Sequence, residues 1–117
     1  MATRRPDTIA RQARERIARI RESLSRIEYL CSGTLLERTK VCGRPGCACA
    51  RDRAARHGPY FEWGHMRAGK LVHRQVSAQH AAALRHAIAN YRLAKQLLRD
   101  WEVETERLID AEQDLQP

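Results

Sequence analysis

Residues 42–60 read CGRPGCACARDRAARHGPY, and they hold three of the four cysteines of the 117-residue chain beside four arginines and a histidine. The order Cys42-x4-Cys47-x-Cys49, followed by His57, offers three thiolates and one imidazole. This is the ligand set of a tetrahedral structural zinc site. The sequence therefore predicts a structural zinc ion bound by Cys42, Cys47, Cys49 and His57.

Other interpretations of this stretch stay open. The spacing lacks the paired two-residue gaps of standard zinc fingers, and Cys31 is an alternative to His57 as the fourth ligand. A redox role for Cys47 and Cys49 would use the nearby arginines to lower the thiol pKa, but no thioredoxin-type context surrounds them. The remaining alternative is a basic surface loop with unligated cysteines.

The segment around these cysteines has the alternation of β-strands. Residues 34–41, 60–66 and 70–76 alternate in side-chain character with a period of two, which is typical of half-buried strands. The turn at residues 67–69 contains Gly69 and joins the last two strands as a hairpin. We expect a small three-stranded antiparallel head of 44 residues, a size that rarely folds without a staple such as a metal ion.

Two long amphipathic helices flank this head. From Thr8 to about Leu30, apolar residues recur at steps of three and four, and Gly33 would end the helix. The face consists of Ala13, Ile17, Ile20, Leu24, Ile27 and Cys31. A second helix is predicted from Ser77, as N-cap, to about Gln113. Its face consists of Leu84, Ile88, Tyr91, Leu98, Trp101 and Leu108, with Lys95 and Glu102 interrupting a strict heptad.

These elements predict an α+β fold in which the two helices form a coiled-coil-like stalk. We divide the chain into three segments. Residues 1–33 form a basic arm, TRRPD, and the first helix; residues 34–77 form the cysteine-rich head; residues 78–117 form the long second helix with its acidic end. Because the first helix is too short to cover the second, we expect a homodimer or a partner protein along the stalk.

Charge is distributed unevenly along the chain. The net charge of the chain is +8. Residues 1–33 have eight basic and four acidic residues, for a net charge of +4, and residues 34–77 have nine and three, for +6. Residues 78–117 have five basic and seven acidic residues, for −2. No run of eighteen apolar residues occurs, and the acidic residues near the start argue against a transit peptide. We expect a cytoplasmic chain whose thiols stay reduced, and no membrane contact.

The basic residues of the head predict a polyanion-binding surface. The alternative is a solvated loop, but strand and loop cations together could neutralise several phosphates, and neighbouring aromatic rings could stack on bases. The expected nucleic-acid-binding residues are Arg38, Lys40, Arg44, Arg51, Arg53, Arg56, Tyr60, Trp63, Lys70 and Arg74. No motif for sequence-specific nucleic-acid recognition is present, so we expect no strong sequence specificity. No acid/base pair or activated nucleophile is present either, so we expect no enzyme activity. The choice between DNA and RNA stays open.

Several motifs in fixed order resemble a known family. These are GTLLERTKVCGRPGCACA, HGPYFEW, GKLVHRQVS and IANYRLAKQLL, covering about 65 residues from Gly33 onward. They resemble a family of small bacterial and archaeal proteins whose domain has no assigned function, with Phe61 standing where that family has a second tyrosine. The resemblance implies that one unit of the family is formed by Cys42, Cys47, Cys49, His57, Gly58, Pro59 and Tyr60. Some members of the family lie beside transposase-like genes.

Taken together, the sequence predicts a non-catalytic nucleic-acid-binding protein with a structural zinc site, an accessory to a mobile-element system. The alternative is an adaptor whose helices dock onto a partner protein.

Overall fold

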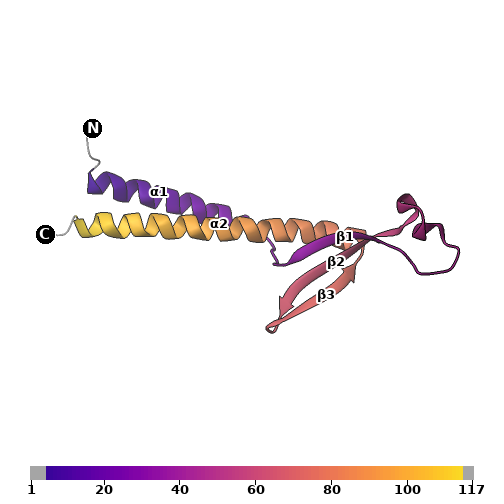
Figure 1. Cartoon of the computed structure of the whole chain (residues 1–117). Helices are drawn as coiled ribbons and strands as arrows, with labels where there is room; N and C mark the ends of the chain where they lie inside the picture. The colour runs from indigo at the N-terminus through magenta and orange to yellow at the C-terminus, as the bar shows by residue number, and fades with distance from the viewer. Residues whose placement is uncertain (1–4, 115–117) are drawn as a thin grey trace. The chain divides into compact units, whose positions relative to one another are not determined.

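The computed structural model describes residues 5–114 and confirms an α+β chain with a three-stranded antiparallel sheet and two helices. The elements are α1 (Pro6–Ser25), β1 (Thr34–Lys40), η1 (Ala48–Ala50), η2 (Arg53–Ala55), β2 (His57–Arg67), β3 (Lys70–Val76) and α2 (Ala78–Asp114) (Figure 1). They form two compact units. The helical unit combines the chain up to Tyr29 with the chain from Asn90 onward, and the sheet unit spans Leu30–Ala89.

Helix α1 begins and ends earlier than its apolar pattern predicts. Pro6 starts it, because proline lacks the N–H that a first helical residue would leave unbonded. It ends at Ser25, where the Arg26 N–H donates to backbone oxygens of the last turn. Ile27 and Cys31 therefore lie outside the helix, and the prediction that it extends to Leu30 is wrong. Thr3 and Arg4 of the expected basic arm lie outside the described residues.

Helix α2 confirms the predicted N-cap. The Ser77 Oγ accepts a hydrogen bond from the His80 N–H at 3.0 Å, which satisfies one of the free donors of the first turn. The helix then continues without proline to Asp114. Neither helix of the described chain has an apolar stretch long enough to cross a membrane.

In the helical unit, α1 lies antiparallel to the C-terminal part of α2 (Figure 1). The covered positions of α1 include Ala13 and Ile20, as its pattern predicts, and also Ala10, which lies outside the predicted face. In the C-terminal part of α2, one stripe of buried or half-buried residues follows alternating steps of three and four. It consists of Ala94, Leu97, Trp101, Glu104, Leu108 and Ala111. This seam bypasses Lys95 and Glu102, and it leaves Leu98, predicted to be on the seam, 51% exposed.

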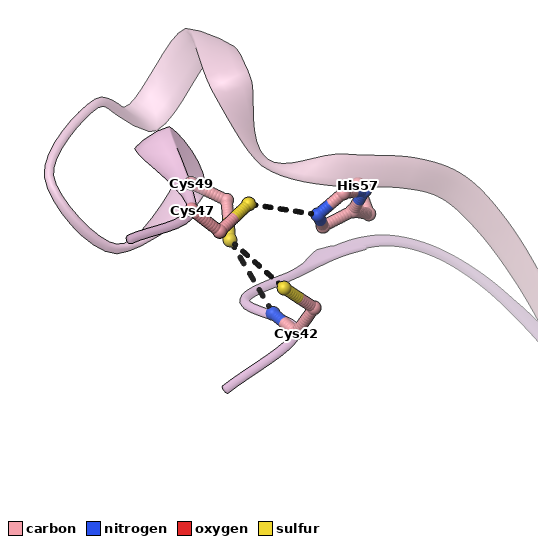
Figure 2. Close-up of side chains that lie close together, drawn as sticks. All are labelled: Cys42, Cys47, Cys49 and His57. Atoms are coloured by element: carbon pink, nitrogen blue, oxygen red, sulfur yellow. Dashed lines mark hydrogen bonds between the residues drawn. The ribbon is translucent and has the colours of Figure 1, made fainter. Parts of the chain in front are cut away.

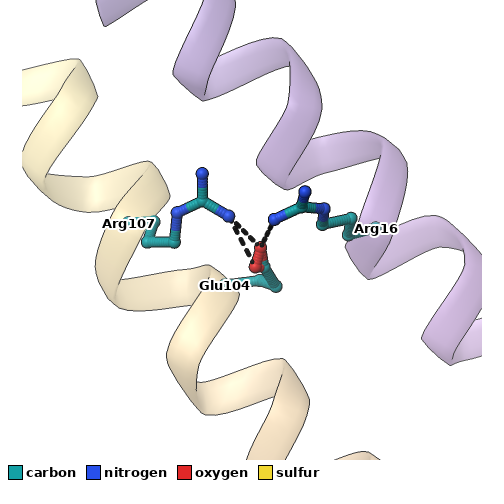
Figure 3. Close-up of polar contacts among 3 residues, drawn as sticks. All are labelled: Arg16, Glu104 and Arg107. Atoms are coloured by element: carbon teal, nitrogen blue, oxygen red, sulfur yellow. Dashed lines mark hydrogen bonds and ion pairs between the residues drawn. The ribbon is translucent and has the colours of Figure 1, made fainter.

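A buried carboxylate lies in this seam. Glu104 is 6% exposed and occupies a position where helix pairs usually place an apolar side chain. Its Oε1 accepts from Arg16 of α1 at 3.1 Å and from Arg107 of its own helix at 2.6 Å (Figure 3). A buried carboxylate is tolerated only when it is paired and hydrogen-bonded. The two arginines therefore make Glu104 compatible with the seam and link the two helices.

Replacing Glu104 with alanine tests this link. We expect Glu104→Ala to lower the free energy of unfolding of the helical unit by about 1–3 kcal/mol, because hydrogen bonds between charged groups are lost. The matched control Glu102→Ala removes an exposed carboxylate two residues away and should change it by less than about 0.5 kcal/mol. Urea unfolding followed by circular dichroism measures both. Equal losses in the two variants would contradict a specific role for Glu104.

The sheet has the order β1-β2-β3, with both neighbouring pairs antiparallel. Arg67 pairs with Lys70, so Ala68 and Gly69 form a two-residue turn, and both have positive φ as type I′ hairpin turns require. One face of the sheet carries Leu35, Phe61 and Trp63, which pack against a core of Val76, Ala81 and Leu84. Helix α2 therefore covers one face with its first turns, and the other face stays open.

Gly33 immediately precedes β1 and does not cap α1, which ends at Ser25. Its φ is +120°, and a Cβ there would lie 2.4 Å from the Gly64 carbonyl oxygen and 2.6 Å from Trp63 Nε1. The same indole N–H donates to the Ser32 carbonyl at 3.2 Å. The prediction that Gly33 ends the first helix is wrong. This glycine lets the chain pass close to the core tryptophan before β1 begins.

A methyl group at this position should therefore destabilise the head. We expect Gly33→Ala to cost about 3 kcal/mol or more, because unfavourable φ adds to a backbone clash. Gly69→Ala is the matched control: its φ is also positive, at +80°, but nothing lies within 4 Å of the added Cβ. It should cost only about 1–2 kcal/mol. Denaturant unfolding monitored by tryptophan emission compares them, and a Gly69→Ala loss as large as that of Gly33→Ala would refute the clash.

Candidate metal centre

The pairing of β1 with β2 brings both ends of the cysteine-rich loop together. The last pair joins Lys40 to His57, which is the first residue of β2. Between the Arg38–Tyr60 pair and this one the register shifts, so β2 carries one extra residue, a β-bulge. His57 therefore lies opposite Lys40, the last residue of β1, and Cys42 follows Lys40 by two residues. His57 is the first residue of β2, whereas the sequence predicted that it would precede this strand.

One tight turn and two glycines with positive φ fold the loop back on itself. Gly43 and Gly46 have φ of +75° and +78°, values that favour glycine, and the Cys47 N–H donates to the Arg44 carbonyl at 3.3 Å. Short 3₁₀ turns follow at η1 and η2. The Asp52 carboxylate caps the second by accepting from the Ala54 N–H at 3.0 Å. These features place Cys47 and Cys49 beside Cys42.

The four predicted ligands converge in one cluster (Figure 2). All their ligand atoms lie within 4.8 Å of one another. The Cys42 and Cys49 sulfurs are 3.5 Å apart, and the Cys47 sulfur is 3.4 Å from His57 Nε2. A tetrahedral zinc ion with bonds of about 2.3 Å to sulfur and about 2.0 Å to nitrogen separates two sulfur ligands by about 3.8 Å, and a sulfur from a nitrogen by about 3.5 Å. The observed sulfur–sulfur and sulfur–nitrogen distances are close to these ligand separations.

The local electrostatics differ between the thiols. Hydrogen bonds from the backbone and thiol of Cys49, and then from Cys42, lower the pKa of Cys47. The Cys42 N–H also acts to lower the pKa of Cys49, but the bond with Cys47, burial and the Cys42 charge together raise it. Cys49 is 2% exposed. The cluster thus combines one thiol that ionises readily with one that is shielded from water, and a cation among them would favour thiolates throughout.

Cys31 lies elsewhere in the sheet unit. It packs against the Val76, Ala81 and Leu84 core, and burial raises the pKa of its thiol. Its N–H donates to the Ala87 carbonyl at 3.2 Å. These contacts are typical of a small apolar residue. Three cysteines and one histidine, without Cys31, therefore make up the group that could hold a metal ion, and the set is consistent with zinc.

Metal content and a ligand variant test this centre. We expect one zinc ion per chain in protein purified without chelator, and its loss in Cys47→Ser, because a hydroxyl is a much poorer zinc ligand than a thiolate. The variant should be cut by protease within residues 41–57 while most of the helical circular dichroism remains. Cys31→Ser is the control and should retain the ion. Elemental analysis showing no zinc in the wild type would contradict the site.

The basic residues around the cluster fall into two groups. Arg38 and Lys40 lie on the open face of the sheet with Tyr60, and the Lys40 ammonium is 5.1 Å from the Tyr60 ring centroid. These side chains line a shallow hollow together with His73 and Gln75. The exposed loop arginines are Arg44, Arg51, Arg53 and Arg56. Strand and loop cations together form what we call the basic surface: Arg38, Lys40, Arg44, Arg51, Arg53 and Arg56.

Three predicted members do not belong to this surface. Trp63 lies on the core face, where it stacks on His65 at a centroid distance of 3.6 Å. Arg74 pairs with Trp63 and lies over its ring at 5.6 Å, so it shares the same face. Lys70 lies at the hairpin turn, at the opposite end of β2 from His57. Strand alternation already separates Trp63 from Tyr60, because residues three positions apart in a strand lie on opposite faces.

Sequence reasoning missed Glu62 on the open face. Its carboxylate lies 3.8 Å from the Arg38 Nε and 3.3 Å from His73 Nδ1. It therefore neutralises part of the positive charge between the strands. Alternation from Tyr60 to Glu62 was the available signal, because residues two apart share a face. On the core face, burial and then the charges of Arg67 and Arg74 lower the pKa of the His65 imidazole.

Comparison with protein families places these features in one domain. The chain matches the family described as a domain of unknown function, DUF6788, over residues 10–86, and it belongs to that family. The matched region includes the cysteine cluster, the whole sheet and most of α1, which the sequence resemblance had left outside. Comparisons with curated proteins and with solved structures found no significant match.

Proposed function

We propose that this protein binds nucleic acid without catalysis and with little sequence specificity, through the basic surface beside the metal centre. The observation that carries the proposal is the placement of four exposed arginines on the loop that the four metal ligands close. Arg38 and Lys40 extend this charge onto the open sheet face. Phosphate backbones are bound by such arrays of cations.

The metal ion would act on structure only. Cys42, Cys47, Cys49 and His57 would fill all four tetrahedral positions, so no position would remain for a substrate or an activated water. Residues 41–56 include Cys49 as their one buried side chain. Because so little apolar surface is covered there, the ion would supply the ordering that keeps the arginines in a fixed array.

Tyr60 is the aromatic ring that this proposal assigns to base stacking. It is half-buried on the open face beside Lys40. Aromatic rings next to cations are typical of single-strand binding surfaces and tolerate any base. Because some members of the family that the sequence resembles lie beside transposase-like genes, mobile-element DNA is one of the ligands to test for binding.

Salt dependence tests this function. We expect random-sequence DNA or RNA to bind with an affinity that falls steeply between about 50 and 200 mM salt, because bound cations release counterions from the phosphates. The double variant Arg51→Ala/Arg53→Ala should reduce the log–log slope by about 2 for duplex DNA or about 1.4 for single strands. Fluorescence anisotropy measures the slope.

The control uses basic residues outside the basic surface. Arg67→Ala/Lys70→Ala removes the same number of charges at the hairpin turn, and its slope should match that of the wild type. Equal loss in both double variants would indicate binding driven by net charge alone. No measurable binding by the wild type at the lowest salt would refute the function.

A further inference from the structure

The helical unit carries a second surface of opposite character. An open groove along α2 is lined by Leu98, Trp101, Glu102, Glu106, Ile109 and Asp110. Leu98 and Ile109 are each 51% exposed, so large apolar groups face water there. We call this surface the acidic groove. It lies on one flank of the helix, beside the seam that packs against α1.

The groove has the periodicity of a helix-binding surface. Leu98, Trp101 and Ile109 are separated by steps of three and eight, which keeps them on one stripe of α2. Glu102, Glu106 and Asp110 follow at steps of four and form a row of carboxylates along that stripe. From Leu98 to Ile109 the stripe is about 17 Å long, at 1.5 Å per residue. About three turns of a second helix would cover it.

The carboxylates of the groove are not neutralised within the described chain. Glu104 and Glu112 on the same helix are paired with Arg16, Arg107 and Arg14. For Glu102, Glu106 and Asp110, the described residues 5–114 provide no ion pair. A row of unpaired acids beside exposed apolar groups is complementary to a row of basic residues beside apolar groups.

A second copy of this chain does not fit the acidic groove. Two such grooves facing each other would place three carboxylates opposite three more, and like charges at an interface are unfavourable. The basic helix α1 of another copy has its apolar positions Ala10, Ala13 and Ile20 already buried. It therefore has no free apolar stripe to offer. Charge complementarity therefore favours an occupant from a different protein.

We propose that the acidic groove binds an amphipathic helix of a partner protein, about three turns long, whose apolar stripe is bordered by lysines or arginines at steps of four. Leu98, Trp101 and Ile109 would receive the apolar side chains, and Glu102, Glu106 and Asp110 would pair with the cations. This is helix-in-groove recognition. It is independent of the proposed nucleic-acid binding, because it uses residues of the other unit.

A synthetic peptide serves as the probe. It has roughly 15 residues, leucines at steps of three and four, and lysines at steps of four on one edge; its control carries glutamates in place of the lysines. We expect the full chain to bind the lysine peptide saturably with a micromolar Kd and to show a shift in tryptophan emission. The shift should disappear in Trp101→Phe, and the glutamate peptide should not bind.

Variants of the full chain locate the contact. Leu98→Asp and Ile109→Asp should weaken binding of the lysine peptide by at least about tenfold, because each places a charge in the apolar stripe. The matched control Val103→Asp changes a residue that is 57% exposed and lies outside the acidic groove, and its affinity should stay within about twofold. In Glu102→Lys/Glu106→Lys, preference should reverse toward the glutamate peptide.

Four results would overturn the proposal. They are no saturable binding of the lysine peptide, equal binding of both peptides, equal weakening by Val103→Asp, and sedimentation of the wild type as a dimer that Leu98→Asp dissociates. The last result would assign the groove to a second copy. Nucleic-acid binding is measured separately on the same variants and should be unchanged. A failure of the peptide-binding proposal therefore does not contradict the nucleic-acid-binding proposal, and the reverse also holds.

Discussion

The pairing of β1 with β2 is the constraint on which the head depends. Because it ends with Lys40 opposite His57, the two ends of a long, mostly exposed loop are held together before any metal ion is considered. The loop then needs only its glycine turns to bring two more cysteines to the same point. The closeness of the four ligands is thus a consequence of strand register, and the bulge in β2 sets where the histidine lies.

The same register gives the two sheet faces different sets of side chains. Phe61 and Trp63 are directed to the core with Arg74, while Tyr60 and Arg38 share the open face with Glu62. The head, whose composition is basic throughout, is therefore not uniformly basic on its surface. Its cations are concentrated at the loop end of the sheet, and Glu62 lowers the positive charge in the middle of the open face. For a phosphate ligand, the loop end is the favourable part.

Charge is arranged differently in the helical unit, where acids dominate the end of α2. Some of these acids hold the helices together: Glu104 accepts from arginines of both helices inside the seam. Others face water beside exposed apolar side chains. The described chain therefore carries a basic surface in the sheet unit and an acidic groove in the helical unit. Membership of the DUF6788 family covers the head and α1 but ends at residue 86, before the acidic end of α2 begins.

Much of this architecture could be predicted from the sequence. Period-two alternation located the three strands, periods of three and four located both helices, and Ser77 was correctly identified as a cap, because these are local preferences of the backbone and of amphipathic faces. The four side chains that converge could also be named, since three thiols and an imidazole are the donor set of a structural zinc site. The end of α1 was missed because its apolar periodicity continues past Ser25, while the chain must turn toward the sheet.

Only the tertiary structure decided which of these residues meet. Contacts with α2 and the core determined that Cys31 is packed there. Strand register, a long-range property, determined that His57 joins the cysteines. Packing against α2 decided that the face with Trp63 supports the fold while Tyr60 lies on the open side. Helix packing likewise chose the seam through Glu104 and left Leu98 exposed, although periodicity alone favoured Leu98. The sequence by itself determined the elements and the chemistry available to them. Their pairing depended on contacts between segments distant in the chain, which no local pattern encodes.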